Sequence, residues 1–327
     1  MQAVLCKQLG PIEDLTLETV DDPVPGSGEI LIDVHAAGVN FPDLLMVRGH
    51  YQARPPLPFV PGGECAGTVA AVGDEVTRFA VGDRVFAMGM TGAFAEKMTA
   101  PEASVQPVPD VMSLQDAAGV AFTYGTSYYA LKQRAGLRSG ETLLVLGAAG
   151  GVGTAAVALG KAMGARVIAA ASSEEKLDAA VAAGADLRIH YDAESLKDRV
   201  KELTGGHGAD VVYDPVGGDY CEAALRAIAW DGRYLVIGFA AGEIPKIPLN
   251  LALLKSAHII GVFWGAWLQR DPAASQKNFD ELGAMFADGR LKPRVTPMPL
   301  ADFQEALRTI AERRVRGKLV LAMGPSS

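Results

Sequence analysis

Short, almost wholly apolar runs recur through the second half of the chain, and alanine-rich stretches with helical spacing separate them. The runs cover residues 142–146, 166–170, 187–190, 211–214, 234–238 and 258–263. Strands of this length that are apolar on both faces are typical of a parallel sheet, and helices that alternate with them are typical of its crossover connections. The pattern predicts an α/β chain whose second half is a doubly wound parallel sheet.

The first third of the chain has a different texture, with short strands between frequent turns. Residues 29–34 are typical of a strand, and proline, glycine and aspartate mark turns near positions 23–28, 55–63, 72–74 and 81–85. Such spacing predicts an all-β, barrel-like domain. The β texture returns after residues 290–293 and ends in residues 318–321, so we expect the C-terminal segment to rejoin the first domain.

This organisation predicts two domains. Residues 1–122 and 295–327 would form a barrel-like catalytic domain, and residues 123–294 would form a nucleotide-binding domain. The length of 327 residues suits two domains. In open parallel sheets, ligands bind outside the carboxyl ends of the strands. We therefore expect the ligand there, in a cleft that faces the barrel.

Between the first apolar run and the helix that follows lies a glycine-rich segment, with Gly147, Gly150 and Gly153 at intervals of three. A strand, a tight turn and a helix N-terminus form a cradle for phosphate, because side chains are excluded and free N–H groups face the anion. The spacing departs from the usual G-x-G-x-x-G, and the alternative is a turn that binds nothing. The residues expected to hold the pyrophosphate of a dinucleotide are Ala149, Gly150, Gly151 and Val152.

The end of the second apolar run indicates which dinucleotide binds. An NAD-binding unit usually carries Asp or Glu there, about 20 residues past the glycines, for the ribose 2′-hydroxyl. This chain has Ser172 and Ser173 instead, followed by Lys176 on the next helix. Hydroxyl and ammonium groups suit a 2′-phosphate, so the pattern predicts NADPH rather than NADH. The alternative is a pair of helix N-cap serines, and both roles can hold together.

Composition narrows the function classes. The net charge of −8 argues against nucleic acid or an anionic membrane as the main partner. Cys6, Cys65 and Cys221 lie far apart and form no metal-binding or disulfide pattern, which favours the reducing cytoplasm. The N-terminus does not resemble a signal peptide, and no apolar run approaches the roughly 18 residues of a membrane helix.

Several motifs follow one another along the chain: AGVNFPD at 37–43, GHY at 49–51, PGGECAG at 61–67, VGDRV at 81–85, YGT at 124–126, the glycine turn, VYDPVGG at 212–218 and GK at 317–318. Together they resemble the zinc-free quinone oxidoreductase (zeta-crystallin-like) branch of the medium-chain dehydrogenase/reductase superfamily. The resemblance covers the whole chain. It implies a GroES-like β-barrel catalytic domain, a Rossmann domain, and assembly as a homodimer or homotetramer.

The chain departs from the zinc-dependent relatives at their metal ligands. Where they place a cysteine and a histidine, this chain has Asn40 and Gly63, and it lacks their four-cysteine zinc lobe. The resemblance therefore implies an enzyme without a metal. Oxidation of an alcohol is hard without a Lewis acid, which favours reduction of quinones and of conjugated carbonyl compounds.

The resemblance also implies roles for polar residues. Asn40 would stand beside the nicotinamide and orient its carboxamide or hold a substrate oxygen; the alternative is a turn asparagine. Tyr51 would be the proton donor, or else a loop tyrosine that packs on prolines. Thr126 would lie near the nicotinamide or cap a helix. Tyr191 would lie near the adenosine phosphate or be a plain surface aromatic.

Further positions are implied at the cofactor and at the acceptor. The residues expected at the cofactor are Gly238, Phe239, Phe263 and Trp264. The residues expected to line an apolar acceptor pocket are Tyr51, Tyr124, Trp264 and Trp267. For Trp267, a place at a subunit interface is an equal alternative.

Two sets of charged residues remain. In the basic segment 313–318, Arg313 and Lys318 are candidates for the 2′-phosphate, whereas a solvated helix end and RNA binding are the alternatives. Glu64 and Asp43 are assigned to structure, as buried acceptors of hydrogen bonds from the backbone or from arginine.

These expectations define an NADPH-dependent reductase of quinones or α,β-unsaturated carbonyl compounds. Hydride would pass to the quinone or to the β-carbon of an enone or enal, and a proton would arrive from Tyr51 or from water. The nearest enzymatic alternative is an enoyl-thioester (acyl-CoA) reductase. A non-catalytic NADPH- or RNA-binding protein is the alternative from another class.

Overall fold

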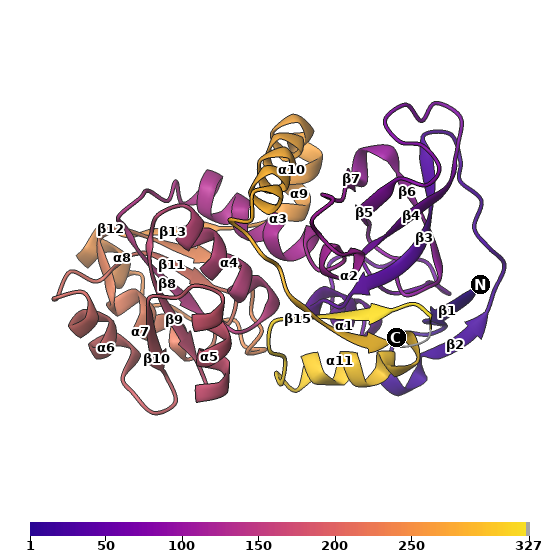
Figure 1. Ribbon diagram of the computed structural model, residues 1–327. Helices are drawn as coiled ribbons and strands as arrows, with labels where there is room; N and C mark the ends of the chain where they lie inside the picture. The colour runs from indigo at the N-terminus through magenta and orange to yellow at the C-terminus, as the bar shows by residue number, and fades with distance from the viewer. Residues whose placement is uncertain (325–327) are drawn as a thin grey trace. The chain divides into compact units, whose positions relative to one another are not determined.

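The computed structural model describes residues 1–324, and the chain divides into two compact units (Figure 1). Residues 1–122 and 283–324 form the first, the β-rich unit, and residues 123–282 form the second, the parallel-sheet unit. The first boundary coincides with the predicted one, whereas the second lies earlier than the predicted 294/295. Residues 325–327 of the predicted first domain lie outside the described residues.

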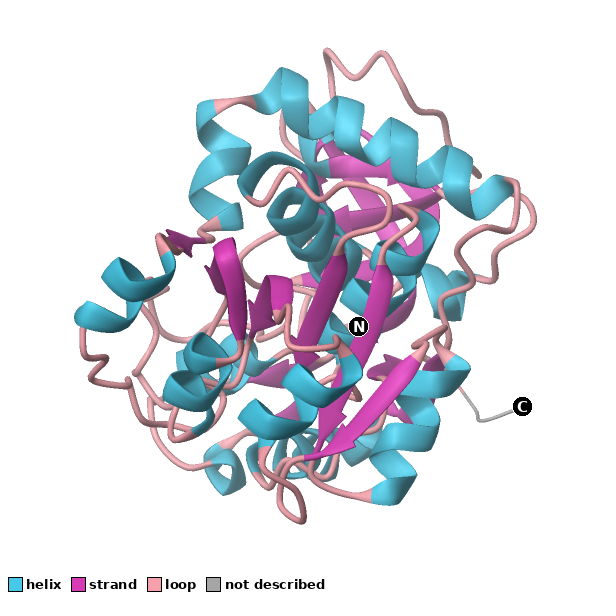
Figure 2. Cartoon of the chain, turned by 90° about the vertical axis from the view of Figure 1, so that its left-hand side faces the viewer, coloured by secondary structure: helices cyan, strands magenta, loops and turns pink. Residues whose placement is uncertain are grey.

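The parallel-sheet unit contains a six-stranded parallel sheet with the strand order β10-β9-β8-β11-β12-β13. Its strands are β8 (Thr142–Leu146), β9 (Arg166–Ala171), β10 (Leu187–His190), β11 (Ala209–Asp214), β12 (Ile228–Val236) and β13 (His258–Gly261). Its helices, two of which extend into the β-rich unit, are α3 (Ala121–Tyr129), the π-helical turn η3 (Ala130–Arg134), α4 (Gly151–Ala162), α5 (Glu174–Ala182), α6 (Leu196–Leu203), α7 (Tyr220–Arg226), α8 (Asn250–Lys255), α9 (Trp264–Arg270) and α10 (Pro272–Ala287). Figure 2 shows helices on both sides of these strands. The predicted doubly wound sheet is confirmed, and its order reverses between β8 and β11.

Most strand bounds agree with the apolar runs. β8 and β10 have the predicted bounds, and all five residues of β8 are buried. The exception is β12, which begins at Ile228 rather than at the predicted residue 234. Asp231 adopts a left-handed conformation (φ 60°) beside Gly232, a combination that is typical of a turn. The pairing of β12 with β11 accommodates this irregularity through a shift in register.

The unit boundary falls within α10 because the first part of this helix bonds to α3 and η3. Glu281 accepts a hydrogen bond from the Tyr128 hydroxyl at 2.6 Å. Asn278, which is buried, accepts one from Lys132 Nζ at 3.0 Å. These contacts join residues far apart in the sequence, so the periodicity of the chain did not reveal them.

The β-rich unit is built on a seven-stranded sheet with the order β14-β15-β3-β4-β5-β7, in which β6 also pairs with β3. Its strands are β3 (Glu29–Gly38), β4 (Glu64–Val72), β5 (Arg84–Met88), β6 (Lys97–Pro101), β7 (Val105–Pro107), β14 (Val295–Pro299) and β15 (Lys318–Ala322), and a separate antiparallel pair is formed by β1 (Gln2–Leu5) and β2 (Thr16–Thr19). Its helices are α1 (Phe41–Val47), α2 (Leu114–Ala117) and α11 (Phe303–Ala311), with short 3-10 turns η1 (Ile12–Asp14), η2 (Glu102–Ser104) and η4 (Leu300–Asp302). β15 pairs with β3, so the C-terminal segment rejoins the first domain as predicted.

Each unit has its own apolar core. Ile30, Ile32 and Phe94 are fully buried in the β-rich unit, and Leu144 and Ile168 are fully buried in the parallel-sheet unit. Burial of a side chain of this size stabilises the fold by about 1.5–3 kcal/mol. No helix among residues 1–324 is both long and apolar enough to cross a membrane.

Candidate active site

The turn after β8 depends on glycine at two positions. Gly147 adopts a left-handed conformation (φ 56°), and its carbonyl oxygen accepts a hydrogen bond from Gly150 N–H at 3.0 Å. A Cβ atom on Gly153 would overlap the Gly147 carbonyl oxygen and would lie 2.9 Å from Ala148 Cα. Only glycine at position 153 therefore lets α4 begin so close to the end of β8.

The first turn of α4 offers unused hydrogen-bond donors. Within residues 1–324, the N–H groups of Gly151, Val152 and Gly153 donate to no carbonyl group, whereas Thr154 N–H donates to Gly150 O at 2.8 Å. These groups, with the positive end of the helix dipole, suit a phosphate or pyrophosphate. The turn follows β8 at the point where the strand order reverses, which is where nucleotides bind in such sheets.

The loop after β11 packs against the glycine turn. Asp214 ends β11, and its Oδ1 accepts hydrogen bonds from Val216 N–H at 2.7 Å and Gly217 N–H at 2.9 Å, while the Tyr234 hydroxyl donates to Oδ2. Burial raises the pKa of Asp214. A Cβ atom on Gly147 would lie 2.8 Å from Val216 Cγ2. Asp214 thus fixes the loop that faces the turn, a role that sequence reasoning missed.

α3 supports the beginning of α4 through Ser127. This fully buried hydroxyl donates to Val152 O at 3.1 Å and shares a hydrogen bond of 2.8 Å with the Tyr213 hydroxyl. The neighbouring Thr126 is half-buried inside α3, which begins at Ala121. The alternative that Thr126 caps a helix is therefore wrong, and its contact with the nicotinamide stays a prediction.

The polar residues after β9 form a compact group. Ser173 is the N-cap of α5, and its hydroxyl accepts a hydrogen bond from Lys176 N–H at 3.4 Å. Lys176 Nζ reaches back and donates to Ser172 Oγ at 2.9 Å. Tyr191 lies beside them, because its N–H donates to Ala171 O at 3.2 Å at the end of β9. The capping alternative thus holds for Ser173, while Ser172 and Lys176 form a pair of the kind a 2′-phosphate requires.

Gly238 and Phe239 follow β12 beside the loop after β11. Ala240 N–H donates to Pro215 O at 3.1 Å, and a Cβ atom on Gly217 would lie 2.9 Å from Phe239 Cδ1. The segment therefore lies at the same edge of the sheet as the glycine turn, because both follow the carboxyl ends of parallel strands. Its contact with the cofactor stays a prediction.

Two of the aromatic residues expected at the acceptor, Trp264 and Trp267, pack against aromatic rings of the parallel-sheet unit. Trp264 is buried; it meets Phe279 edge to face with ring centroids 6.4 Å apart, and a Cβ atom on Gly125 would lie 2.5 Å from its ring. Trp267 stacks on Tyr129 with centroids 4.4 Å apart. Tyr124 is also buried, whereas Phe263 is 62% exposed. Their places at the acceptor and the cofactor stay predictions.

A buried polar cluster occupies the β-rich unit at Asn40, the residue before α1. Asn40 Nδ2 donates to Glu64 Oε1 at 2.9 Å and to Gly38 O at 3.3 Å. Lys318 Nζ donates to Asn40 Oδ1 and to Val39 O at 3.0 Å, and it lies 2.6 Å from Glu64 Oε1. The side chains of Glu64 and Lys318 are only 1% and 7% exposed. The cluster is thus a buried ion pair that holds an amide.

These contacts correct the role expected for Lys318. An ammonium group has three N–H donors, and here they face Val39, Asn40 and Glu64, so none remains for a phosphate. The predicted 2′-phosphate contact of Lys318 is therefore wrong. Glu64 is the buried acceptor that we expected, and it also accepts Phe122 N–H at 2.9 Å, but its cationic partner is lysine rather than arginine.

Arg313 remains the other basic candidate for the 2′-phosphate. It adopts a left-handed conformation (φ 57°) just after α11, and its N–H donates to Ile310 O at 3.1 Å. Its contact with a phosphate stays a prediction.

Asp43 and Tyr51 extend the cluster. The fully buried Asp43 carboxylate accepts Asn40 N–H at 2.7 Å, and burial raises its pKa to about 7, although the hydrogen bonds and the Lys318 charge oppose this shift. Tyr51 packs against the core of the β-rich unit, and burial, followed by the Asp43 charge, raises its pKa. The phenol therefore stays protonated at neutral pH, as a proton donor must.

Replacing Asp43 by asparagine should change how stability depends on pH. The pKa of about 7 in the folded chain lies above the ordinary value of 3.8, so the unfolded chain loses this proton first as the pH rises. Relative to Asp43→Asn, we expect the unfolding free energy of the wild type to fall by up to about 4 kcal/mol between about pH 4 and pH 8. Urea unfolding at several pH values measures this difference, and a difference that does not vary with pH would contradict the prediction.

The surroundings of Gly63 do not fit the zinc site of the metal-dependent relatives. A Cβ atom at this position would lie 2.8 Å from the Phe122 ring, and the adjacent Glu64 is already paired with Lys318. Among residues 1–324, no group of three or more His, Cys, Asp or Glu side chains is arranged to hold a metal ion.

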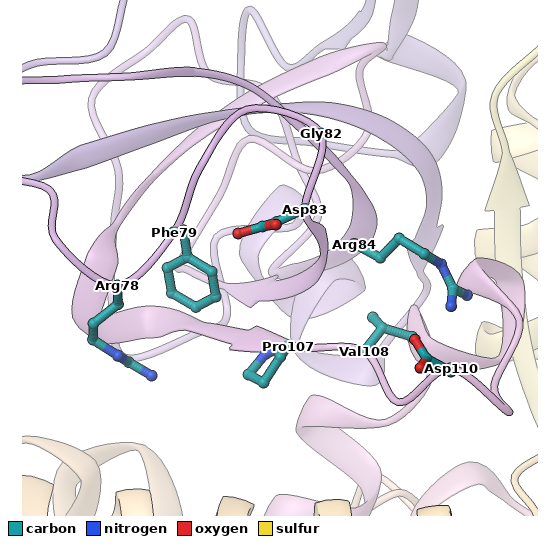
Figure 3. A pocket seen from close by; sticks show the side chains of 8 residues that line it. All are labelled: Arg78, Phe79, Gly82, Asp83, Arg84, Pro107, Val108 and Asp110. Carbon is teal, nitrogen blue, oxygen red and sulfur yellow. The ribbon is translucent and has the colours of Figure 1, made fainter.

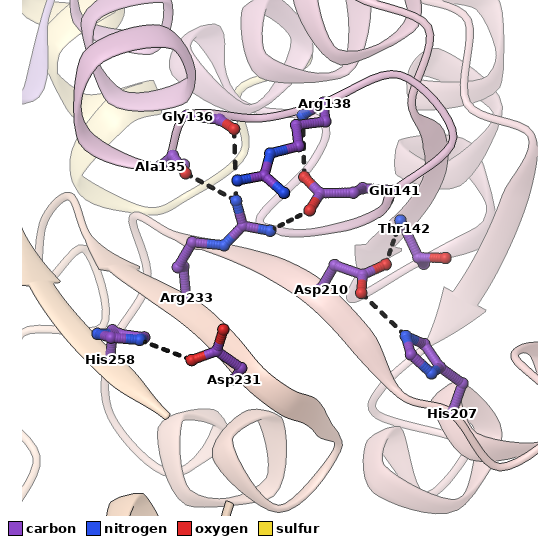
Figure 4. Close-up of polar contacts among 10 residues, drawn as sticks. All are labelled: Ala135, Gly136, Arg138, Glu141, Thr142, His207, Asp210, Asp231, Arg233 and His258. Atoms are coloured by element: carbon purple, nitrogen blue, oxygen red, sulfur yellow. Dashed lines mark hydrogen bonds and ion pairs between the residues drawn. The ribbon is translucent and has the colours of Figure 1, made fainter. Parts of the chain in front are cut away.

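Two other polar regions contain none of the predicted site residues. A shallow hollow in the β-rich unit is lined by Arg78, Phe79, Gly82, Asp83, Arg84, Pro107, Val108 and Asp110 (Figure 3). A network at the amino ends of the strands joins Arg233 to Glu141 and to Ala135 O at 2.8 Å, and Asp210 to Thr142 N–H at 2.7 Å (Figure 4). This network lies at the opposite end of the strands from the glycine turn and ties β8, β11 and β12 together.

Comparison with known proteins agrees with this arrangement. Residues 26–110 match the alcohol dehydrogenase GroES-like domain, and residues 151–281 match the zinc-binding dehydrogenase family. A quinone oxidoreductase-like protein 2 homolog from Nematostella vectensis is 40% identical, over 98% of this chain and 88% of that protein.

Solved structures extend the comparison. Escherichia coli quinone oxidoreductase complexed with NADPH superposes with a TM-score of 0.90 at 29% identity, covering 98% of this chain and 100% of that one. The CurK enoyl reductase superposes with a TM-score of 0.87 at 26% identity, covering 99% of each chain. The chain belongs to the medium-chain dehydrogenase/reductase family, among relatives named quinone oxidoreductases and quinone oxidoreductase-like proteins. It is thus an oxidoreductase.

Proposed function

We propose that this protein is an NADPH-dependent reductase of quinones, of α,β-unsaturated carbonyl compounds, or of both, and that it works without a metal. The observation that carries the proposal is the pairing of a glycine cradle after β8 with the Ser172–Lys176 group after β9. The two positions directly after β9, where a carboxylate would receive a ribose 2′-hydroxyl, are Ser172 and Ser173.

The chain's own groups fit this cofactor. The N–H groups of Gly151, Val152 and Gly153 would hold the pyrophosphate. The cradle exists because Gly153 has no Cβ atom, which would overlap the backbone of the turn. Lys176 and Ser172 would bind the 2′-phosphate. When bound, NADPH supplies a hydride from its nicotinamide ring to an electrophilic acceptor. The protein would orient the reactants and exclude water.

The metal-free part of the proposal follows from the residues at the former ligand positions. Gly63 has no side chain, and Glu64 is already engaged by Lys318. With no Lewis acid, the acceptor must itself be electrophilic, as quinones and conjugated carbonyl compounds are. Metal analysis of the purified protein tests this point, and one zinc ion per chain would overturn it.

A panel of acceptors tests the function as a whole. NADPH oxidation would be measured with quinones, enones, enals and enoyl-CoA thioesters, and NADP⁺ reduction with simple primary alcohols. We expect quinones, enones or enals to be reduced fastest and alcohols not to be oxidised. The similarity to an enoyl reductase makes enoyl thioesters the second candidate. Preference for the thioesters would select that candidate, and faster alcohol oxidation would refute both.

Replacing Tyr51 by phenylalanine should slow enone reduction more than quinone reduction. An enone must receive a proton at carbon, where a positioned donor accelerates the step by roughly 10²–10⁴-fold, whereas a reduced quinone takes protons from water readily. Steady-state rates on both substrates would measure the difference. Equal losses, or no loss on the enone, would remove Tyr51 from the reaction.

Replacing Lys176 by alanine should weaken NADPH and leave NADH nearly unchanged. The lost contact is a charge-assisted hydrogen bond of about 1.5–3 kcal/mol, which corresponds to roughly 10- to 150-fold in affinity. Fluorescence titration with both cofactors would measure it. The salt bridge of Lys161 with Asp186 lies on the same unit, so Lys161→Ala is the control. Equal loss of both cofactors would contradict the clamp.

We further propose a homodimer in the cytoplasm. β13 ends the sheet, and several large apolar side chains near this edge are exposed: Trp230 (69%), Leu253 (77%) and Phe263 (62%). An open strand edge beside apolar side chains is a site for a second copy. The three cysteines are free and buried, which suits a reducing compartment. Light scattering should give about twice the chain mass of 34.2 kDa, and a monomer would refute the assembly.

A further inference from the structure

His190 lies directly beside the Ser172–Lys176 pair. It is the last residue of β10 and pairs in register with Ala171, the last residue of β9. Its ring nitrogen Nε2 lies 2.9 Å from the carbonyl oxygen of Ser172. A carbonyl oxygen can only accept a hydrogen bond, so Nε2 carries a proton and donates it. His190 therefore holds the first residue of the turn that leads into α5.

The backbone of His190 keeps the ring in place. Its N–H donates to Glu194 Oε1 at 3.0 Å, and its carbonyl oxygen accepts from Ala193 N–H at 3.0 Å and Glu194 N–H at 2.9 Å. The side chain is only 24% exposed. A ring that is anchored in this way supports the turn, rather than following its movements.

Ser172 is consequently fixed at two points. His190 holds its carbonyl oxygen, and Lys176 Nζ donates to its hydroxyl at 2.9 Å. A hydroxyl that accepts from an ammonium group keeps its own proton for another acceptor, and the ammonium group keeps two further N–H donors. The pair therefore presents donors, which is what an anion requires.

The charged groups around His190 also matter. Its Nδ1 lies 3.7 Å from Glu174 Oε1, and Arg188 lies 3.5 Å from the other oxygen of this carboxylate. Glu194 is paired with Arg199 at 3.3 Å. Glu174 directly follows Ser173, so a freely moving carboxylate there would repel a phosphate. Arg188 is the cation that holds this carboxylate on the β10 side.

We propose that His190 is a positioning residue for the 2′-phosphate subsite. It would favour NADPH over NADH because it fixes the carbonyl group of Ser172, the residue whose hydroxyl lies against Lys176. The inference rests on the proposed function, in which Ser172 and Lys176 receive the 2′-phosphate. His190 would thus contribute to the choice of cofactor without contacting the phosphate itself.

Calorimetric titration with two fragments tests the proposal without enzyme activity. Adenosine 2′,5′-bisphosphate and 5′-AMP differ only in the 2′-phosphate, so the ratio of their Kd values reports this subsite alone. We expect the wild type to bind the bisphosphate more tightly. His190→Ala should reduce that preference by about 2- to 10-fold, the value of one hydrogen bond, and leave the Kd of 5′-AMP unchanged.

Matched variants separate positioning from folding. His190→Gln can place an N–H donor near the position of Nε2, so it should keep most of the preference. His207→Ala is the control, since His207 pairs with Asp210 at 2.9 Å in the network at the other end of the strands. If His190→Ala does not fold, His190→Leu, which keeps the bulk, carries the same comparison.

Each outcome has a defined meaning. If the wild type binds both fragments equally, the 2′-phosphate subsite of the proposed function fails. If the wild type prefers the bisphosphate and His190→Ala or His190→Leu keeps that preference unchanged, the subsite stands and the role of His190 is refuted. Loss of preference in His207→Ala to the same extent would also refute it.

Discussion

Replacing Gly153 by alanine is expected to weaken NADPH binding by about 10²–10⁴-fold. The added Cβ atom would overlap the Gly147 carbonyl oxygen and meet Ala148 Cα at 2.9 Å, both of which are backbone and cannot turn aside. The first turn of α4 must then move away from β8. Two charge-assisted hydrogen bonds from its N–H groups to the pyrophosphate would be lost, each about 1.5–3 kcal/mol. Fluorescence titration with NADPH would measure the change.

A control separates the turn from helix substitution in general. Gly283 lies within α10, and a Cβ atom there would meet nothing within 4 Å. Gly283→Ala should therefore leave NADPH affinity unchanged. Circular dichroism would check that Gly153→Ala is folded. An affinity within a factor of about three of the wild type would show that this turn is not the pyrophosphate site.

Replacing Lys318 by methionine is expected to lower the unfolding free energy by about 3–5 kcal/mol. The substitution leaves the Glu64 carboxylate, which is 1% exposed, without its cation, and leaves Asn40 Oδ1 without its donor. Removing one partner of a buried pair costs more than the pair itself contributes, because the remaining charge stays buried. Urea unfolding followed by circular dichroism would measure the loss.

The second partner provides the decisive comparison. Lys318→Met/Glu64→Gln contains no unpaired charge, so it should recover a large part of the loss. Lys7→Met is the matched control, because Lys7 forms an exposed salt bridge with Glu18 and should change stability by less than about 1 kcal/mol. If Lys318→Met were no more destabilising than Lys7→Met, the ion pair would not be buried in solution.

The features that sequence predicted well are local. β8 is a continuous apolar run, and its residues, with the glycine turn that follows, lie within a short stretch whose conformation they determine themselves. The N-cap role of Ser173 is equally local, since its hydroxyl meets the N–H three residues later. The order of apolar runs and helices was sufficient to predict the parallel sheet.

The features that sequence missed depend on distant residues. Lys318 lies 278 positions from Asn40, and its basic neighbours made a solvated helix end or a phosphate contact the natural interpretations. One signal was present: Glu64 lies in an apolar strand, and a buried carboxylate requires a cation. Asp214 gave no such signal, because its role depends on how the loop after β11 folds back on it.

The neighbours of Asn40 determine the orientation of its side-chain amide. Lysine only donates and carboxylate only accepts, so Oδ1 must face Lys318 and Nδ2 must face Glu64. Both N–H groups of Nδ2 are already used, on Glu64 and on Gly38 O, so this amide has no free N–H donor for a ligand. Asn40 therefore cannot donate to a ligand's carbonyl oxygen, and only its Oδ1, an acceptor, could face a ligand's N–H or O–H. Of its two expected roles, orienting a carboxamide through its NH₂ group is compatible with this geometry, whereas holding a substrate's carbonyl oxygen is not.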